Sequence, residues 1–148
     1  MMDPRHDPYR ARKKPHTPAV CPDCALVCLR GRWQHAPAPD KAHRERCPAC
    51  ARIHDRFPAG YVTIEGPYAW EHRAEILETA RHFAQRMQAE HPLERIIAIE
   101  ESDDKVVITT TDIHVAQGIG RALHHAFHGN LHYGFSEGEY LLRVTWAA

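Results

Sequence analysis

Residues 21–50 read CPDCALVCLRGRWQHAPAPDKAHRERCPAC, and the C-x-x-C pairs at the two ends, Cys21/Cys24 and Cys47/Cys50, decide how this part of the chain folds. Each pair can direct two sulfurs at one ion from a tight turn, and two pairs complete the tetrahedral thiolate shell that suits Zn²⁺. The 22 residues between the pairs fit a zinc ribbon, in which a β-hairpin separates them. The sequence therefore predicts one structural Zn²⁺ ion on these four cysteines.

Other uses of paired cysteines are a redox dithiol and an iron–sulfur cluster. A thioredoxin-type motif needs a C-x-x-C at the start of a helix within a βαβ unit, and we expect neither pair to have that context. A catalytic zinc ion keeps an open position, whereas four cysteines fill the shell, which favours a structural ion. The fifth cysteine, Cys28, is interpreted as a small apolar residue on the first ribbon strand.

The composition indicates a cytoplasmic protein without a membrane segment. No run of the 148 residues approaches the roughly 20 apolar residues that cross a bilayer, and the N-terminus lacks an apolar signal stretch. Five cysteines, an odd number, argue against a disulfide framework. Neither a glycine-rich phosphate loop nor a serine-nucleophile motif is present. We therefore predict no catalytic residues, no small-molecule substrate and no enzymatic activity.

Three segments differ in pattern along the chain. Residues 1–19 are rich in Pro, Arg, Lys and His and predict a disordered basic tail, because they cannot bury enough apolar surface to offset the entropy of ordering. Residues 20–66 hold both cysteine pairs and a short β-prone run at 61–64, and are assigned to the zinc ribbon. Residues 67–148 show helical and strand periodicities and are assigned to a separate α+β domain.

In residues 67–148 the order of elements is α-ββ-α-ββ. Apolar residues recur with helical spacing from 70 to 90, and a second helix is capped by Thr111 or Asp112 and ends near Gly129. Strand-like runs at 95–101 and 105–111 form one hairpin, and alternating residues at 131–135 and 140–146 form another. The predicted fold class is α+β, with an N-terminal zinc ribbon followed by helices packed on an antiparallel sheet.

Charge is distributed unevenly along the chain. Residues 1–58 carry twelve basic and six acidic side chains, whereas residues 59–148 carry seven basic and thirteen acidic ones. Four thiolates and one Zn²⁺ lower the N-terminal excess from +6 to +4, which still favours contact with a polyanion. The candidate nucleic-acid-binding residues are Arg12, Lys13, Lys14, Arg30, Arg32, Trp33, Arg44 and Arg46.

Two further stretches complete a family resemblance. The similarity lies in both cysteine pairs, in Gly31-Arg32-Trp33 between them, and in residues 107–114 and 118–124. In these stretches the chain is similar to short bacterial proteins of the nonsense-mediated-decay-three family. The archaeal and eukaryotic members of that family are zinc-ribbon proteins that bind the large ribosomal subunit, and the eukaryotic one is its nuclear export adaptor. This chain is far shorter, lacks the additional domains and export signals, and has Ala25 where ribbon knuckles often place Gly. The resemblance implies association with RNA or a ribosomal particle.

Two alternative functions remain open. The acidic residues 59–148 could dock a protein partner, which would make the chain an adaptor in a stress response. The second predicted helix carries His114, His124, His125 and His128 on its polar face, and His124 and His128 have the i, i+4 spacing of a metal clamp. A metal-dependent hydrolase is the third possibility, although the H-E-x-x-H pattern is missing.

Overall fold

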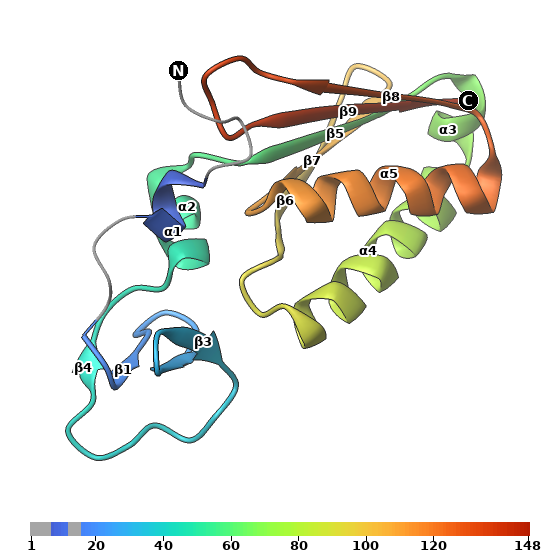
Figure 1. The fold of residues 1–148 in the computed structure, drawn as a ribbon. Helices are drawn as coiled ribbons and strands as arrows, with labels where there is room; N and C mark the ends of the chain where they lie inside the picture. The colour runs from blue at the N-terminus through green and yellow to red at the C-terminus, as the bar shows by residue number, and fades with distance from the viewer. Residues whose placement is uncertain (1–6, 12–15) are drawn as a thin grey trace.

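The computed structural model describes residues 7–11 and 16–148, which form a mixed α+β structure with two sheets. We call residues 16–56 the cysteine module and residues 59–148 the helix–sheet domain. Figure 1 shows the cysteine module at one end of the helix–sheet domain, next to the loop that connects α4 to β6.

The cysteine module contains a small four-stranded sheet in the order β3-β2-β1-β4. The β2–β3 hairpin lies between the two cysteine pairs, as their spacing predicts, and turns at Arg30 and Gly31, which both have positive φ. After β4 the chain enters helix α2 (Pro48–Asp55). The strands are β1 (Ala19–Val20), β2 (Val27–Leu29), β3 (Arg32–Gln34) and β4 (His43–Arg44).

The helix–sheet domain consists of a five-stranded sheet in the order β6-β7-β5-β9-β8, covered on one face by two long helices (Figure 1). These helices are α4 (Arg73–Glu90) and α5 (Ile113–Phe127), and a short helix α3 (Pro67–Glu71) precedes them. Within the described residues, no helix combines the length and apolar character needed to cross a membrane. The strands are β5 (Gly60–Glu65), β6 (Ile96–Ser102), β7 (Lys105–Thr110), β8 (Asn130–Phe135) and β9 (Leu142–Ala147).

The predicted α-ββ-α-ββ order is confirmed, and local sequence explains its boundaries. Asp112 caps α5, because its carboxylate accepts a hydrogen bond from the backbone N–H of His114 at 2.7 Å. Asp103 and Asp104 turn the β6–β7 hairpin with φ of 47° and 64°, a conformation that Asp tolerates better than most residues.

Strand β5 corrects the predicted boundary at residue 66. It belongs to the helix–sheet domain, where it lies at the centre of the sheet between β7 and β9. Val62 and Ile64 on its inner face are fully buried against the helices, which explains why the strand joins this core. Its pairing with β9 is parallel, whereas the other pairs of this sheet are antiparallel. The prediction of a purely antiparallel sheet is therefore wrong at one pairing.

The stretch predicted to be a disordered tail also differs from expectation. Residues 8–11 form a short helix, α1 (Pro8–Ala11), in which Tyr9 is buried and donates its hydroxyl to Asp55 of α2 at 2.8 Å. Residues 16–19 lead directly into β1, where Ala19 is fully buried. Residues 1–6 and 12–15 of the predicted tail lie outside the described residues.

The central position of β5 is tested by two substitutions on its opposite faces. Ile64→Ala leaves a cavity in the core and should lower the free energy of unfolding by about 2–5 kcal/mol. Thr63→Ala, on the other face of the same strand, should cost about 1 kcal/mol or less. Urea unfolding of the metal-saturated protein measures both changes, and equal small costs would contradict a core position for β5.

Candidate metal centre

The four predicted cysteines converge in space. The sulfurs of Cys21, Cys24, Cys47 and Cys50 all lie within 4.8 Å of one another, and those of Cys24 and Cys47 are 3.7 Å apart. A tetrahedral ion with metal–sulfur bonds of about 2.3 Å places its sulfurs roughly 3.8 Å apart. All four side chains are in the described part of the chain, and none of them forms a disulfide. The cluster therefore has the donor set and spacing to bind one metal ion.

The first pair is held by a tight turn between β1 and β2. The N–H of Cys21 donates to the carbonyl of Leu26 at 2.8 Å, and the N–H of Ala25 donates to the carbonyl of Cys21 at 2.9 Å. Ala25 has a φ of 66°, in the left-handed region that glycine adopts most easily. The turn thus uses a strained alanine at the position where similar turns often have glycine.

The second pair sits at the start of helix α2, but the strands before and after this helix, β4 and β5, belong to different sheets, so the βαβ unit of a thioredoxin-type motif is not formed. Cys47 is the N-cap, Pro48 is in the first turn, and the N–H of Cys50 donates to the sulfur of Cys47 at 3.4 Å. Proline suits this place because it lacks the N–H that a first helical residue cannot use. The N-terminal end of a helix also stabilises thiolates, which metal binding requires.

Arg95, in the loop before β6, reaches the cysteine cluster from the helix–sheet domain. Its Nη1 lies 3.4 Å from the sulfur of Cys50, and its Nη2 lies 3.3 Å from that of Cys24 and 3.7 Å from that of Cys47. The guanidinium thus donates to three of the four sulfurs and brings one positive charge to them. Four thiolates around a divalent ion carry a net charge of −2, so Arg95 offsets half of it.

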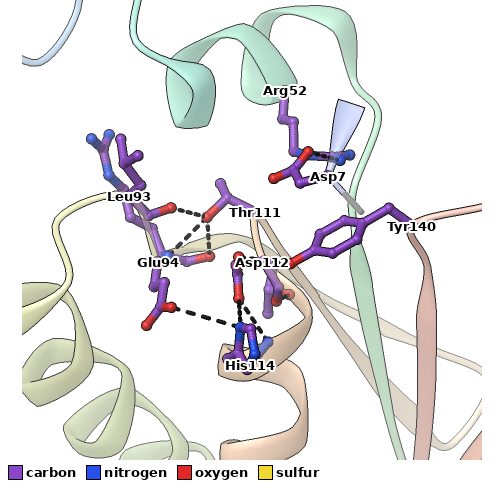
Figure 2. A network of polar contacts seen from close by, with 10 residues as sticks. Asp7, Arg52, Leu93, Glu94, Thr111, Asp112, His114 and Tyr140 are labelled. Atoms are coloured by element: carbon purple, nitrogen blue, oxygen red, sulfur yellow. Dashed lines mark hydrogen bonds and ion pairs between the residues drawn. The ribbon is translucent and has the colours of Figure 1, made fainter. Parts of the chain in front are cut away.

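The loop that carries Arg95 is fixed by hydrogen bonds to Thr111, the residue after β7. Figure 2 shows the Thr111 hydroxyl beside the carbonyl of Leu93, to which it donates at 2.7 Å. The same hydroxyl accepts from the N–H of Arg95 at 2.9 Å, and the side-chain Nε of Arg95 donates to the carbonyl of Pro92 at 2.8 Å. These contacts hold the guanidinium in place, which limits the entropy lost when it meets the sulfurs.

Burial and hydrogen bonds act in opposite directions on the thiols. Burial disfavours the thiolate of Cys24, but hydrogen bonds from the backbone of Leu26 and from Arg95 outweigh it and lower its pKa to about 7. Burial raises the pKa of Cys50 to about 11, although Arg95 opposes it, and burial likewise raises the pKa of Cys47. A metal ion must displace protons from such thiols, so metal affinity falls as the pH falls.

The structure also gives the positions of the other predicted site residues. Cys28 is buried on β2 and is not part of the four-sulfur cluster. Trp33 is half-buried and packs against that cluster. Arg46 pairs with Asp23 at 2.6 Å in an exposed contact. Arg30, Arg32, Arg44 and Arg46 are exposed, whereas Arg12, Lys13 and Lys14 lie outside the described residues.

Arg52, one of the basic residues of the cysteine module, is not available to a polyanion. Its side chain is 2% exposed and pairs with Asp7 at 2.8 Å, while its guanidinium lies over the ring of Tyr9 at 4.3 Å. Figure 2 shows this pair close to Tyr140 of the helix–sheet domain. The sequence shows only that Arg52 is charged. Its pairing with Asp7, 45 residues earlier in the chain, depends on the fold.

A second group of potential ligands was missed by the sequence reasoning. A carboxylate oxygen of Glu94, one of Asp112 and a ring nitrogen of His114 lie within 4.8 Å of one another (Figure 2). Asp112 caps α5 through one oxygen and accepts from the Tyr140 hydroxyl at 3.0 Å through the other. These bonds give the group a structural use, because they connect the β6 loop, α5 and the end of the β8–β9 hairpin.

The histidine face of α5 is exposed, as its periodicity predicts. The rings of His124 and His128 are 6.4 Å apart in an edge-to-face arrangement, and no third ligand among the described residues joins them. His114 lies at the other end of the helix, in the group with Asp112 and Glu94. Within the described residues, the i, i+4 histidine pair thus has none of the further ligands that a catalytic metal site needs.

Comparison with known proteins adds no family to this description. A scan against protein-family models and searches of curated proteins and of solved structures each found no match for the chain. The resemblance noted from the sequence motifs accordingly stays a prediction.

Removal of one ligand tests the metal centre. Wild-type protein should contain about one metal ion per chain, and Cys47→Ala should lose it, because three thiolates bind more weakly than four. The cysteine module should then lose its order, while β5 and the rest of the helix–sheet domain stay folded. Cys28→Ala is the matched control and should keep the metal. Elemental analysis and amide exchange measure these outcomes, and a metal-free, fully ordered Cys47→Ala protein would contradict them.

The role of Arg95 is tested separately. Arg95→Ala should weaken metal binding about 10- to 100-fold, the usual effect of removing a group that hydrogen-bonds metal ligands. Arg95→Lys keeps the charge but loses the planar guanidinium, so its metal affinity should lie between those of the wild-type protein and Arg95→Ala. Arg81→Ala, an exposed arginine on α4, is the control. Competition with a chromophoric chelator gives the affinities, and unchanged affinity in Arg95→Ala would show that its contact with the sulfurs is incidental.

Proposed function

We propose that this chain is a non-enzymatic zinc protein that binds RNA, or a ribosomal particle through its RNA, with the cysteine module as the contact surface. Four soft thiolates in a tetrahedral arrangement favour Zn²⁺ over the hard cations Mg²⁺ and Ca²⁺. Because all four positions are filled by protein ligands, the ion has no open site for a substrate. Its role is to fold the module and hold it in place.

The observation that carries the RNA proposal is the set of exposed arginines on the small sheet, two of which lie next to a half-buried tryptophan. Arg30 lies in the turn of the β2–β3 hairpin, Arg32 follows it at the start of β3, and Arg44 lies on β4 at the opposite edge of the same small sheet. Trp33 follows Arg32 on β3 and is partly accessible. Guanidinium groups that contact phosphates, next to an aromatic ring that can stack on a base, are typical of single-stranded RNA-binding surfaces.

Two further considerations support the proposal. Arg95 offsets part of the negative charge of the thiolates, so the metal centre opposes the approach of RNA less than the thiolates alone would. The resemblance of the cysteine pairs and of residues 107–124 to the nonsense-mediated-decay-three family implies the same class of partner. Apart from the end of α4 beside the cysteine module, the acidic helix–sheet domain then faces away from the RNA.

A protein adaptor is the second candidate, and one feature favours it. Strand β8 is an edge of the five-stranded sheet, and its Tyr133 and Phe135 are 41% and 48% exposed. An edge strand with exposed aromatic side chains can pair with an added strand of a partner.

The salt dependence of binding tests the proposal. Removing one arginine that neutralises a phosphate should flatten the slope of log affinity against log salt by about 0.7 for single-stranded RNA. Arg30→Ala/Arg32→Ala should therefore flatten it by roughly 1.4 and weaken binding without changing sequence preference. Fluorescence anisotropy with labelled RNA at several salt concentrations measures the slope.

The control for this experiment is Arg81→Ala/Arg86→Ala, which removes the same charge from exposed positions on α4. Its slope should equal that of the wild-type protein, and both double variants should keep their metal. Absence of RNA binding, or the same change of slope in both variants, would refute the RNA proposal and favour the adaptor.

A further inference from the structure

A cleft lies where the cysteine module meets the end of helix α4. Its volume is about 470 Å³, within the usual range of sites that bind small ligands. Trp33 of β3 and Pro48 of α2 line it from the cysteine module, and Leu93 of the β6 loop lines it from the helix–sheet domain. The cleft thus combines an aromatic ring with apolar walls from both parts of the chain.

The charges of the cleft are separated between its two sides. The cysteine module contributes Arg32, Arg46 and Glu45, whose carboxylate pairs with His16, whereas the end of α4 and the loop after it contribute Glu90 and Glu94. Arg46 pairs with Asp23, but that contact is exposed and contributes little, so Arg46 can exchange it for a phosphate. One side of the cleft therefore suits an anion, and the opposite side suits a group that donates hydrogen bonds.

Glu90 is the acidic residue best placed to accept hydrogen bonds from a ligand. It is exposed and forms no ion pair with another residue in the described part of the chain. Glu94 is 7% exposed and lies 3.8 Å from the ring of His114, and Glu45, which also lines the cleft, pairs with His16. Glu90 is also the last residue of α4, where the helix carbonyls add further acceptors.

A nucleotide has the same polarity as the cleft, with an anionic phosphate at one end and a base at the other. Among the four RNA bases, guanine alone presents two adjacent donors, N1–H and the N2 amino group, on its pairing edge. A carboxylate can accept both at once, whereas the pairing edges of adenine, cytosine and uracil each place an acceptor beside a donor. Trp33 offers the stacking surface that a base in this position needs.

From this arrangement we propose that the cleft binds an unpaired guanine, with its base against Trp33, its pairing edge on the carboxylate of Glu90 and its phosphate near Arg32 and Arg46. This inference deepens the proposed function and rests on it. It assigns to an RNA-binding surface a preference for one base, which phosphate contacts alone do not supply.

The experiment compares short single-stranded RNAs that differ at one position. Oligo(U) with one central guanine should bind the full-length, metal-loaded protein roughly 5- to 100-fold more tightly than the same RNA with adenine there. Inosine keeps N1–H but lacks the amino group, and should give an intermediate affinity. Because only the RNA changes, the comparison does not depend on the folding of a variant.

Two variants locate the effect in the cleft. Glu90→Gln should reduce the preference for guanine over adenine to less than threefold, because an amide replaces one acceptor by a donor. Glu78→Gln, at an exposed position on the same helix, is the control and should keep the preference. Guanosine monophosphate should quench tryptophan fluorescence in the wild-type protein, and Trp33→Phe should abolish the quenching.

The outcomes separate this inference from the function on which it rests. RNA binding that shows the expected salt slope but no base preference would overturn the guanine site and leave the RNA function intact. A guanine preference that Glu90→Gln does not alter would equally overturn the assignment to this cleft. If no RNA and no nucleotide bind, both the inference and the RNA function fail.

Discussion

The contact between Arg95 and the sulfurs of the cysteine cluster is the interaction on which the position of the cysteine module against the helix–sheet domain depends. A buried group of thiolates is stable only when its charge is matched, and a divalent ion matches half of it. Arg95 supplies the next positive charge, and it does so from the helix–sheet domain. The cysteine cluster therefore also connects the two parts of the chain. The cleft lies beside this contact, with Leu93 close to Arg95 in the same loop.

A second contact between the two parts of the chain also depends on charge matching. Arg52 of α2 is buried, and Asp7 from the N-terminal segment provides its counter-charge. Tyr9 covers the guanidinium on one side, and Tyr140 of the helix–sheet domain lies 5.6 Å from it on another. Ordering of residues 7–11 thus follows from a buried cation that needs a partner, even though this segment has little apolar surface of its own.

Local spacing in the sequence was enough to predict the clustering of the four cysteines and the α-ββ-α-ββ order. Cysteine pairs, capping Asp112 and alternating strands are patterns within a few neighbouring residues, so they can be read without the fold. Strand β5 was assigned to the wrong part of the chain because its partners, β7 and β9, lie more than 40 residues further along. Arg95 was read only as part of a strand, since its contacts with the sulfurs span 45 to 71 residues. Tertiary packing decides where these residues lie, and the periodicity of a single segment carries no information about that packing.

X-ray absorption at the metal edge of the purified, full-length protein tests the proposed metal ligands most directly. If the ion is the proposed zinc, the zinc edge should show four sulfur neighbours at about 2.3 Å and no nitrogen or oxygen ligand. Nitrogen or oxygen atoms bound directly to the metal, or a bound metal other than zinc, would contradict the proposed tetrathiolate zinc centre. Absence of metal together with sulfur–sulfur bonds among the four cysteines would contradict the metal centre altogether.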